Sequence, residues 1–200
     1  MITGRLYVAL SCPDGALSES VNQTQIDVPD VSIGDMNSVS IRQARPADVE
    51  AIVDLAARTW RAAYGEILRE ETIDAALAEW YTPGGTREAI KSEEVGYFVA
   101  IDGEVVGYVS GHAGDTTARL GAIYVAPDRW GGGIGTRLLE RFEGYCRDRG
   151  CEQIEFEVLA DNDIGQSFYR ARGYGPVETQ AVDLFEETVR EKVFRGEIDG

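Results

Sequence analysis

A glycine-rich segment is the part of this sequence whose residue types and spacing best suit chemistry. It reads Gly131-Gly132-Gly133-Ile134-Gly135-Thr136, with Arg129 and Arg137 on either side. Glycines let backbone N–H groups approach a ligand, and a helix that begins here adds partial positive charge, so the segment suits a pyrophosphate. It lacks the lysine of a nucleoside-triphosphate loop, and its spacing does not fit a dinucleotide fingerprint. Alone, it indicates a flexible connection as strongly as a ligand site.

A second segment of chemical interest is Asn162-Asp163-Ile164-Gly165-Gln166-Ser167-Phe168-Tyr169-Arg170-Ala171-Arg172-Gly173-Tyr174. Asp161 or Asn162 is predicted to cap a short helix that extends to Arg172. Without further information, Tyr169 is best explained as a half-buried aromatic residue on an amphipathic helix.

Together the two segments resemble the motifs of the GCN5-related N-acetyltransferase (GNAT) superfamily. Residues 125–139 are similar to motif A, Arg/Gln-x-x-Gly-x-Gly/Ala: Gly133 and Gly135 match its glycines, and Trp130 stands in the Arg/Gln position. Residues 162–174 resemble motif B, Asn-x-x-Ala-x-x-Phe-Tyr followed by Gly-Phe/Tyr, with Gly165 in place of the alanine. The two motifs occur in the family's order and at its distance, and the resemblance extends over residues 39–198.

This resemblance implies an N-acetyltransferase that moves an acetyl group from acetyl-CoA directly to a primary amine. In the family, two neighbouring strands splay apart around the pantetheine arm; here these would be residues 120–125 and 154–159. Tyr169 would act as the general acid that protonates the leaving thiolate. The implied cofactor-binding residues are Ile123, Tyr124, Val125, Arg129, Trp130, Gly131, Gly132, Gly133, Ile134, Gly135, Thr136, Asn162 and Tyr169.

The general base stays open at this point. Many relatives carry a glutamate on the strand before motif A, whereas this chain has Arg119 there. Glu155 and Glu157 lie on the other splayed strand, although their alternation also fits a solvent-exposed face. His112 and Asp115 could act through a chain of water molecules, but a single histidine is more often structural than catalytic.

The acceptor is a small-molecule amine or a protein amine, and its pocket is expected beside the first two helices. Trp60, Tyr64, Trp80 and Tyr81 fall there, and of these Trp60 is predicted to be a core residue. A catalytically silent acetyl-CoA-binding sensor is the alternative, supported by Arg119. A third hypothesis, an acetyltransferase directed at tRNA or the ribosome, is disfavoured by the acidic charge.

The surrounding elements predict an α/β domain at residues 38–200, with the GNAT-type mixed, largely antiparallel sheet, splayed central strands and flanking helices. Hydrophobic periodicity gives a strand, two helices, three strands, a helix, a strand, a helix and two further strands. In this interpretation Pro83-Gly84-Gly85 ends the second helix. Residues 1–37 show no sustained period and are predicted to be a poorly ordered extension, and translation could start at Met36.

The composition of the chain indicates the conditions in which the protein works. The 200-residue chain carries 35 acidic and 19 basic residues, for a net charge of −16, and only Lys91 and Lys192 are lysines. Such a surface is typical of a protein working in concentrated salt, where self-repulsion is screened, although a GC-rich genome also favours arginine. Nonspecific binding to nucleic acid is disfavoured.

The cysteines and the apolar segments bear on metal binding and on membrane association. Cys12, Cys146 and Cys151 have no metal-ligand spacing, so we predict no metal and reduced thiols in a cytoplasmic protein. No apolar run approaches the roughly 20 residues of a bilayer span, so no membrane association is expected. The pattern is compatible with a homodimer but does not specify one.

Overall fold

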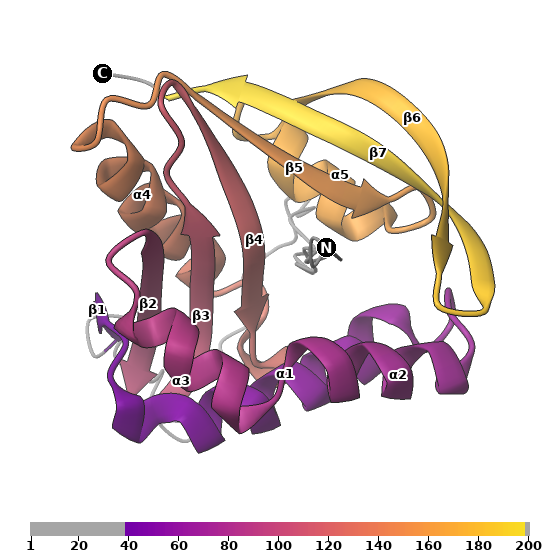
Figure 1. The fold of residues 1–200 in the computed structure, drawn as a ribbon, viewed down its shortest axis with the longest axis horizontal. Helices are drawn as coiled ribbons and strands as arrows, with labels where there is room; N and C mark the ends of the chain where they lie inside the picture. Colours follow the sequence, from indigo (N-terminus) through magenta and orange to yellow (C-terminus); the bar gives the residue numbers. More distant parts are fainter. Residues whose placement is uncertain (1–38, 199–200) are drawn as a thin grey trace, which may run out of the picture.

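The computed structural model describes residues 39–198, which form a seven-stranded sheet with helices on both faces (Figure 1). The strand order is β1-β2-β3-β4-β5-β7-β6. The predicted extension over residues 1–37 and the proposed start at Met36 lie outside the described residues. The strands are β1 (Ser40–Gln43), β2 (Val95–Asp102), β3 (Glu104–His112), β4 (Thr117–Val125), β5 (Gln153–Leu159), β6 (Gly175–Leu184) and β7 (Glu187–Glu197).

The central strands β4 and β5 form a parallel pair, whereas the other neighbouring strands are antiparallel. Three residue pairs join them, the last of which is Arg119 with Glu155. Beyond that pair β4 continues to Val125 and β5 to Leu159, and the two strands diverge (Figure 1). The predicted mixed, largely antiparallel sheet with splayed central strands is therefore confirmed.

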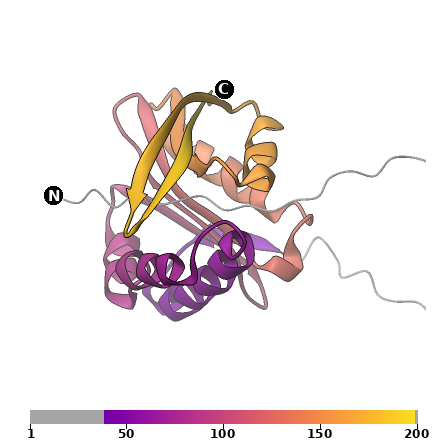
Figure 2. The same ribbon diagram turned by 90° about the vertical axis from the view of Figure 1, so that its right-hand side faces the viewer.

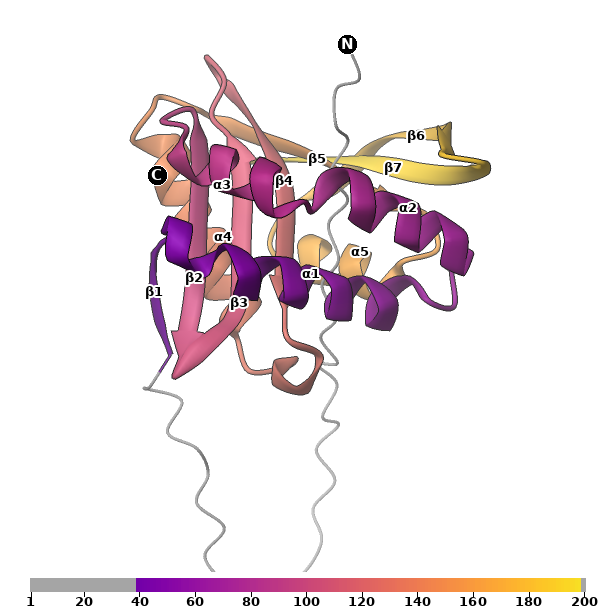
Figure 3. The ribbon, with the colours of Figure 1, turned by 60° about the horizontal axis from the view of Figure 1, so that its bottom comes forward.

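Helices cover both faces of the sheet, and each face has its own hydrophobic cluster (Figures 2 and 3). The cluster on one face includes residues of α1, α2 and α3, and the cluster on the other includes residues of α4 and α5. The periodicity of apolar positions explains this division, because each helix directs one stripe of side chains toward the sheet. The helices are α1 (Val49–Tyr64), α2 (Glu70–Trp80), α3 (Pro83–Lys91), α4 (Ile134–Arg147) and α5 (Asp163–Arg170), with short 3-10 turns at Pro46–Asp48 and Pro127–Arg129.

The helix α3 corrects the sequence analysis, which treated Pro83-Gly84-Gly85 as a break. Pro83 occupies the first turn of α3, where a proline loses no helical hydrogen bond. The side chain of Thr82 accepts from the backbone N–H of Gly85 at 3.1 Å and caps the helix. The segment therefore ends one helix and begins the next.

The turn between β6 and β7 is fixed against α2. Glu187 Oε2 accepts from the backbone N–H of Arg69 at 3.2 Å and from the hydroxyl of Thr72 at 2.6 Å. Its carboxylate thus caps the N-terminus of α2 from another part of the chain. In the same turn Phe185 has a φ of 56°, and its ring lies 5.5 Å from that of Trp80. The hydrogen bond from Thr72, with help from the Arg69 backbone and side chain, holds the pKa of Glu187 below its ordinary value.

Replacing Glu187 by alanine should lower the free energy of unfolding by about 1 kcal/mol near pH 7, because α2 loses its cap. The lowered pKa means that this stabilisation is present above the ordinary glutamate value of about 4.3 and is lost as pH falls through the folded-state value. Urea unfolding of wild type and variant should therefore converge in acid. The exposed neighbour Glu186 is the matched control: Glu186→Ala should change stability by less than about 0.5 kcal/mol. Equal losses at neutral pH would contradict the capping role.

Candidate functional site

The glycine-rich segment forms the turn that leads into α4. Gly131 and Gly133 adopt left-handed backbone angles, with φ of 79° and 73°, which side chains other than glycine rarely accept. Gly133 is the N-cap of α4, and among residues 39–198 no side chain caps this helix. The N–H groups of the first turn therefore begin next to an exposed glycine turn, where the partial positive charge of the helix favours an anion.

Trp130 and Arg129 are both engaged within the protein. Trp130, in the Arg/Gln position of motif A, donates its indole N–H to the carbonyl of Val125 at 2.8 Å. Arg129 binds the carboxylate of Asp102 at 2.7 Å. Trp130 therefore brings no charge to the turn, and the charge of Arg129 is shared with an acid. Their roles in cofactor binding stay predictions.

The strands β4 and β5 diverge after the pair of Arg119 and Glu155 and leave an opening between them. Backbone groups of Ile123 and Val125 lie on the β4 edge of this opening. The N–H of Ala126 donates to the carbonyl of Val106 on β3 at 2.9 Å. Bonded and non-bonded pairs alternate along an antiparallel ladder, so Tyr124 also bonds toward β3. The N–H and C=O groups of Ile123 and Val125 therefore point toward β5. In this direction they could form hydrogen bonds with an extended ligand lying in the opening.

The helix α5 begins at Asp163 and is capped by Asn162, which decides between the two caps considered from sequence. Its Oδ1 accepts from the backbone N–H of Gly165 at 2.9 Å. A Cβ at Gly165 would lie 2.6 Å from Asn162 Nδ2, so the Asn162 side chain in this structure takes up space that the glycine leaves open. Nδ2 itself is buried and has no hydrogen-bond partner within residues 39–198. One donor of this side chain thus remains for a ligand.

Tyr169 is fully buried on α5, with its ring 4.2 Å from that of Phe156. Its hydroxyl has no hydrogen-bond partner in the described part of the chain. Burial raises the pKa of Tyr169 well above its usual value, the neighbouring hydroxyls of Tyr64 and Tyr174 raise it further, and Arg172 opposes them. The phenol therefore keeps its proton at neutral pH.

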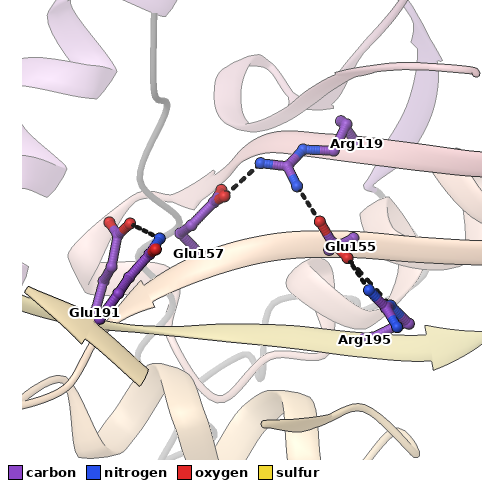
Figure 4. Close-up of polar contacts among 6 residues, drawn as sticks. Arg119, Glu155, Glu157, Glu191 and Arg195 are labelled. Carbon is purple, nitrogen blue, oxygen red and sulfur yellow. Dashed lines mark hydrogen bonds and ion pairs between the residues drawn. The ribbon is translucent and has the colours of Figure 1, made fainter. Parts of the chain in front are cut away.

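Arg119 joins the two candidate bases on β5. Its guanidinium binds the carboxylates of both Glu155 and Glu157, and Arg195 of β7 binds Glu155 with an Nε distance of 3.1 Å (Figure 4). Glu157 is 7% exposed and lies past the last β4–β5 pair. Leu159, two residues on, belongs to the cluster under α1, α2 and α3. Because side chains alternate along a strand, Glu157 faces that same side.

Aromatic side chains fill the space between α1, α2 and the sheet, namely Trp60, Tyr64, Tyr81, Tyr108 and Tyr124. Trp60 is completely buried, so its prediction as a core residue is confirmed. The hydroxyls of Tyr81 and Tyr124 are 3.2 Å apart. Burial raises the pKa values of Tyr81, Tyr108 and Tyr124, so these groups stay neutral near pH 7.

A cavity of about 120 Å³ adjoins this cluster, between α3 and the strands β2, β3 and β4. Trp80 and Tyr81 line it, as does His112. His112 is the chain's single histidine and is exposed at the end of β3. Of the candidate bases, Glu155 and Glu157 lie where β4 and β5 diverge, whereas His112 lies at this cavity.

Arg172 is a residue that the sequence analysis did not single out. Its guanidinium binds the hydroxyl of Thr136 in the first turn of α4. The two residues lie 36 positions apart, so no local pattern indicated the contact. Position within motif B was the available signal, because the end of that motif lies beside the start of motif A's helix in this fold.

Within residues 39–198, no group of three or more His, Cys, Asp or Glu side chains could hold a metal ion. None of the helices in this range is long and apolar enough to cross a membrane. Cys146 and Cys151 are buried free thiols, and burial raises the pKa of Cys146 to about 12.

Comparison with known proteins links this geometry to one family. The profile of the acetyltransferase (GNAT) family matches residues 49–174. The chain is 26% identical over 157 residues to a spermidine N(1)-acetyltransferase of Thermoplasma acidophilum, covering 75% of this chain and 96% of that protein. It is 30% identical over 155 residues to an aminoglycoside N(6')-acetyltransferase type 1 of Stenotrophomonas maltophilia, covering 73% and 91% respectively.

Solved structures show the same fold. The crystal structure of PaiA N-acetyltransferase from Thermoplasma acidophilum in complex with coenzyme A has a TM-score of 0.71 at 22% identity, over 80% of this chain and 99% of that one. The ribosomal-protein-S18-alanine N-acetyltransferase from Escherichia coli has a TM-score of 0.60 at 18% identity, over 81% and 95%.

Proposed function

Because the chain belongs to the acetyltransferase (GNAT) family and is thus an acyltransferase, we propose that it transfers an acetyl group from acetyl-CoA to a primary amine by direct attack in a ternary complex. The observation that carries this proposal is the opening between β4 and β5, which begins after Arg119 and Glu155. The uncapped glycine turn and the buried hydroxyl of Tyr169 flank it. Residues 38–200 would form the catalytic domain.

The residues beside the opening fit acetyl-CoA, which when bound supplies the thioester acyl group. The N–H groups at the start of α4 would hold the pyrophosphate, and the β4 edge at Ile123 and Val125 would pair with the pantetheine arm. Asn162 Nδ2 and the Tyr169 hydroxyl are buried donors without partners among the described residues. An unsatisfied buried donor costs about 1–3 kcal/mol, which a bound amide oxygen would recover at Asn162. The thioester sulfur is a weak acceptor, so the Tyr169 hydroxyl would gain a strong partner only as the thiolate forms.

The two proton transfers would take place on opposite faces of the sheet. We assign the general base to Glu157, because it is buried, faces the side of α1, α2 and α3, and lies past the last β4–β5 pair. Arg119 holds its carboxylate in place. Tyr169 comes from α5, on the opposite face, and would give its proton to the leaving sulfur. The backbone N–H of Ile123, on the edge between them, would donate to the carbonyl oxygen.

The acceptor is proposed to be a small cationic amine. The relatives named for spermidine and aminoglycosides act on such amines, and a net charge of −16 attracts cations. The amine would approach from the side of α1, α2 and α3, where the aromatic cluster and the cavity at Trp80 lie. A protein amine is the second candidate, and the assay below distinguishes them.

The setting of the enzyme is proposed from composition. An acidic surface with two lysines suits concentrated salt, and the free thiols of Cys146 and Cys151 suit the cytoplasm. A chain that folds fully in dilute buffer would contradict the adaptation to salt.

The proposed function is tested by turnover of the full chain with acetyl-CoA. Thiol release should be measured with diamines and polyamines, with amino sugars, and with peptides carrying a free N-terminus or lysine. We expect saturable turnover with a small amine and little with peptides. Tight binding of acetyl-CoA without transfer to any amine would instead support a silent sensor.

A further inference from the structure

Three buried polar atoms on one side of α5 have no hydrogen-bond partner within residues 39–198. They are Nδ2 of Asn162, the hydroxyl of Tyr169 and Nε of Arg172. Their spacing of seven and three residues places them near one helical face, since the chain still turns after α5 with Arg172 N–H bonded to the Tyr169 carbonyl at 3.0 Å. Three unsatisfied donors in a row indicate a ligand rich in acceptors along this face.

Arg172 is the charged member of this row, and its position is well fixed. Its Cζ lies 3.6 Å above the ring centroid of Phe168, and one terminal nitrogen donates to the Phe168 carbonyl at 2.7 Å. The other terminal nitrogen binds the hydroxyl of Thr136, in the first turn of α4. A stacked guanidinium with a planar fork is pre-organised to bind phosphate oxygens. Arg172 therefore brings a fixed positive charge to the glycine turn.

Two other cations lie near this turn. Arg129 is paired with the carboxylate of Asp102, and the exposed Arg137 is held to the carbonyl of Val39 at 2.9 Å. Trp130 replaces the charged or polar residue of motif A and donates to the backbone. The whole chain carries a net charge of −16, which repels a polyanion. A pyrophosphate at this turn therefore needs a local cation, and Arg172 is placed to supply it.

We propose that Arg172 binds the pyrophosphate of the acyl donor and supplies the charge that Trp130 does not. This inference rests on the proposed function, in which acetyl-CoA occupies the opening. The guanidinium would share the pyrophosphate with the helix N-terminus and with the hydroxyl of Thr136. Binding of the donor by this chain is thus divided between motif A, which contributes backbone N–H groups, and the end of motif B, which contributes the cation.

Calorimetric binding of CoA, 3'-dephospho-CoA and pantetheine to the full chain tests this role. Arg172→Met should weaken CoA and 3'-dephospho-CoA by about tenfold or more, because both contain the pyrophosphate, and it should leave pantetheine unchanged. Arg172→Lys keeps the charge without the fork and should lie between wild type and Arg172→Met. Arg170 is the matched control: it binds Gln166 at 3.0 Å, and Arg170→Met should bind all three ligands as wild type does.

Other results of these binding measurements would contradict either the role of Arg172 or the proposed function. Equal weakening of all three ligands would mean that Arg172 only holds α5 against α4, and it would overturn the proposal. A loss confined to CoA would assign the contact to the 3'-phosphate and would also overturn it. If Arg172→Met does not fold, wild-type affinity in Arg172→Lys at high and low salt alike overturns the proposal, because a pyrophosphate contact must be weaker without the fork. Failure of the wild-type chain to bind CoA would contradict the proposed function itself.

Discussion

Replacing Tyr169 by phenylalanine is expected to lower kcat for acetyl transfer by about 100-fold or more, and to leave the Kd of acetyl-CoA nearly unchanged. The ring is enclosed by aromatic neighbours such as Phe156 and Phe168, with centroids 4.2 Å and 5.1 Å away, and phenylalanine keeps these contacts. Only the hydroxyl is lost. It has no hydrogen-bond partner among residues 39–198, so its removal breaks no bond within the described fold.

Single-turnover and steady-state kinetics, with calorimetric binding of acetyl-CoA, check this prediction. Tyr174→Phe is the matched control, because the Tyr174 hydroxyl donates to Glu143 at 2.7 Å and is not one of the unsatisfied donors. It should cost stability but little kcat. Since the pKa of Tyr169 is raised, ionisation of its phenol should not limit kcat until well above pH 10. Unchanged kcat in Tyr169→Phe would remove the general acid from the mechanism.

The sequence predicted well where chemistry and local structure coincide. The glycine turn at Gly133 was predicted to precede a helix, because helical periodicity begins directly after it, and the structure places Gly133 at the N-cap of α4. The strands at either side of the opening were also predictable, since their apolar patterns are strong and the family resemblance implies their divergence. Asn162 and Asp161 were equivalent caps in the sequence, and the tertiary position of the chain decided between them.

The misses have two physical causes: α3 was missed although its cap is a local contact, whereas the others depend on distant contacts. Thr82 caps α3, so Pro83 stands in the first turn of a helix. Proline is common both in that position and where a helix breaks, so the residue alone did not decide between the two. Glu187 caps α2 from 118 residues away, and Arg172 reaches Thr136 from 36 away. Arg119 counted against catalysis in the sequence because it stood where relatives carry an acid. In the structure it holds two acids instead.

Replacing Glu157 by glutamine should lower kcat/KM by about 100-fold near neutral pH, with little change in acetyl-CoA binding. The amide can still accept from Arg119, so the contact between β4 and β5 is preserved and only the ability to take a proton is lost. The neighbour Glu155 is the matched control, because it binds the same arginine and also Arg195. Glu155→Gln weakens ion pairs to half-exposed arginines and should change kcat/KM less than about threefold.

The pH profile separates a base from a residue that only positions Arg119. A base becomes unnecessary once the amine is already neutral, so the rate of Glu157→Gln should rise with pH and approach that of wild type in alkali. A purely structural role predicts the same fold-loss at every pH, and that result would move the base elsewhere. His112 is then the next residue to test, because it lies at the cavity lined by Trp80 and Tyr81, on the side from which the amine is proposed to enter. His112→Gln should leave the wild-type profile intact if Glu157 is the base.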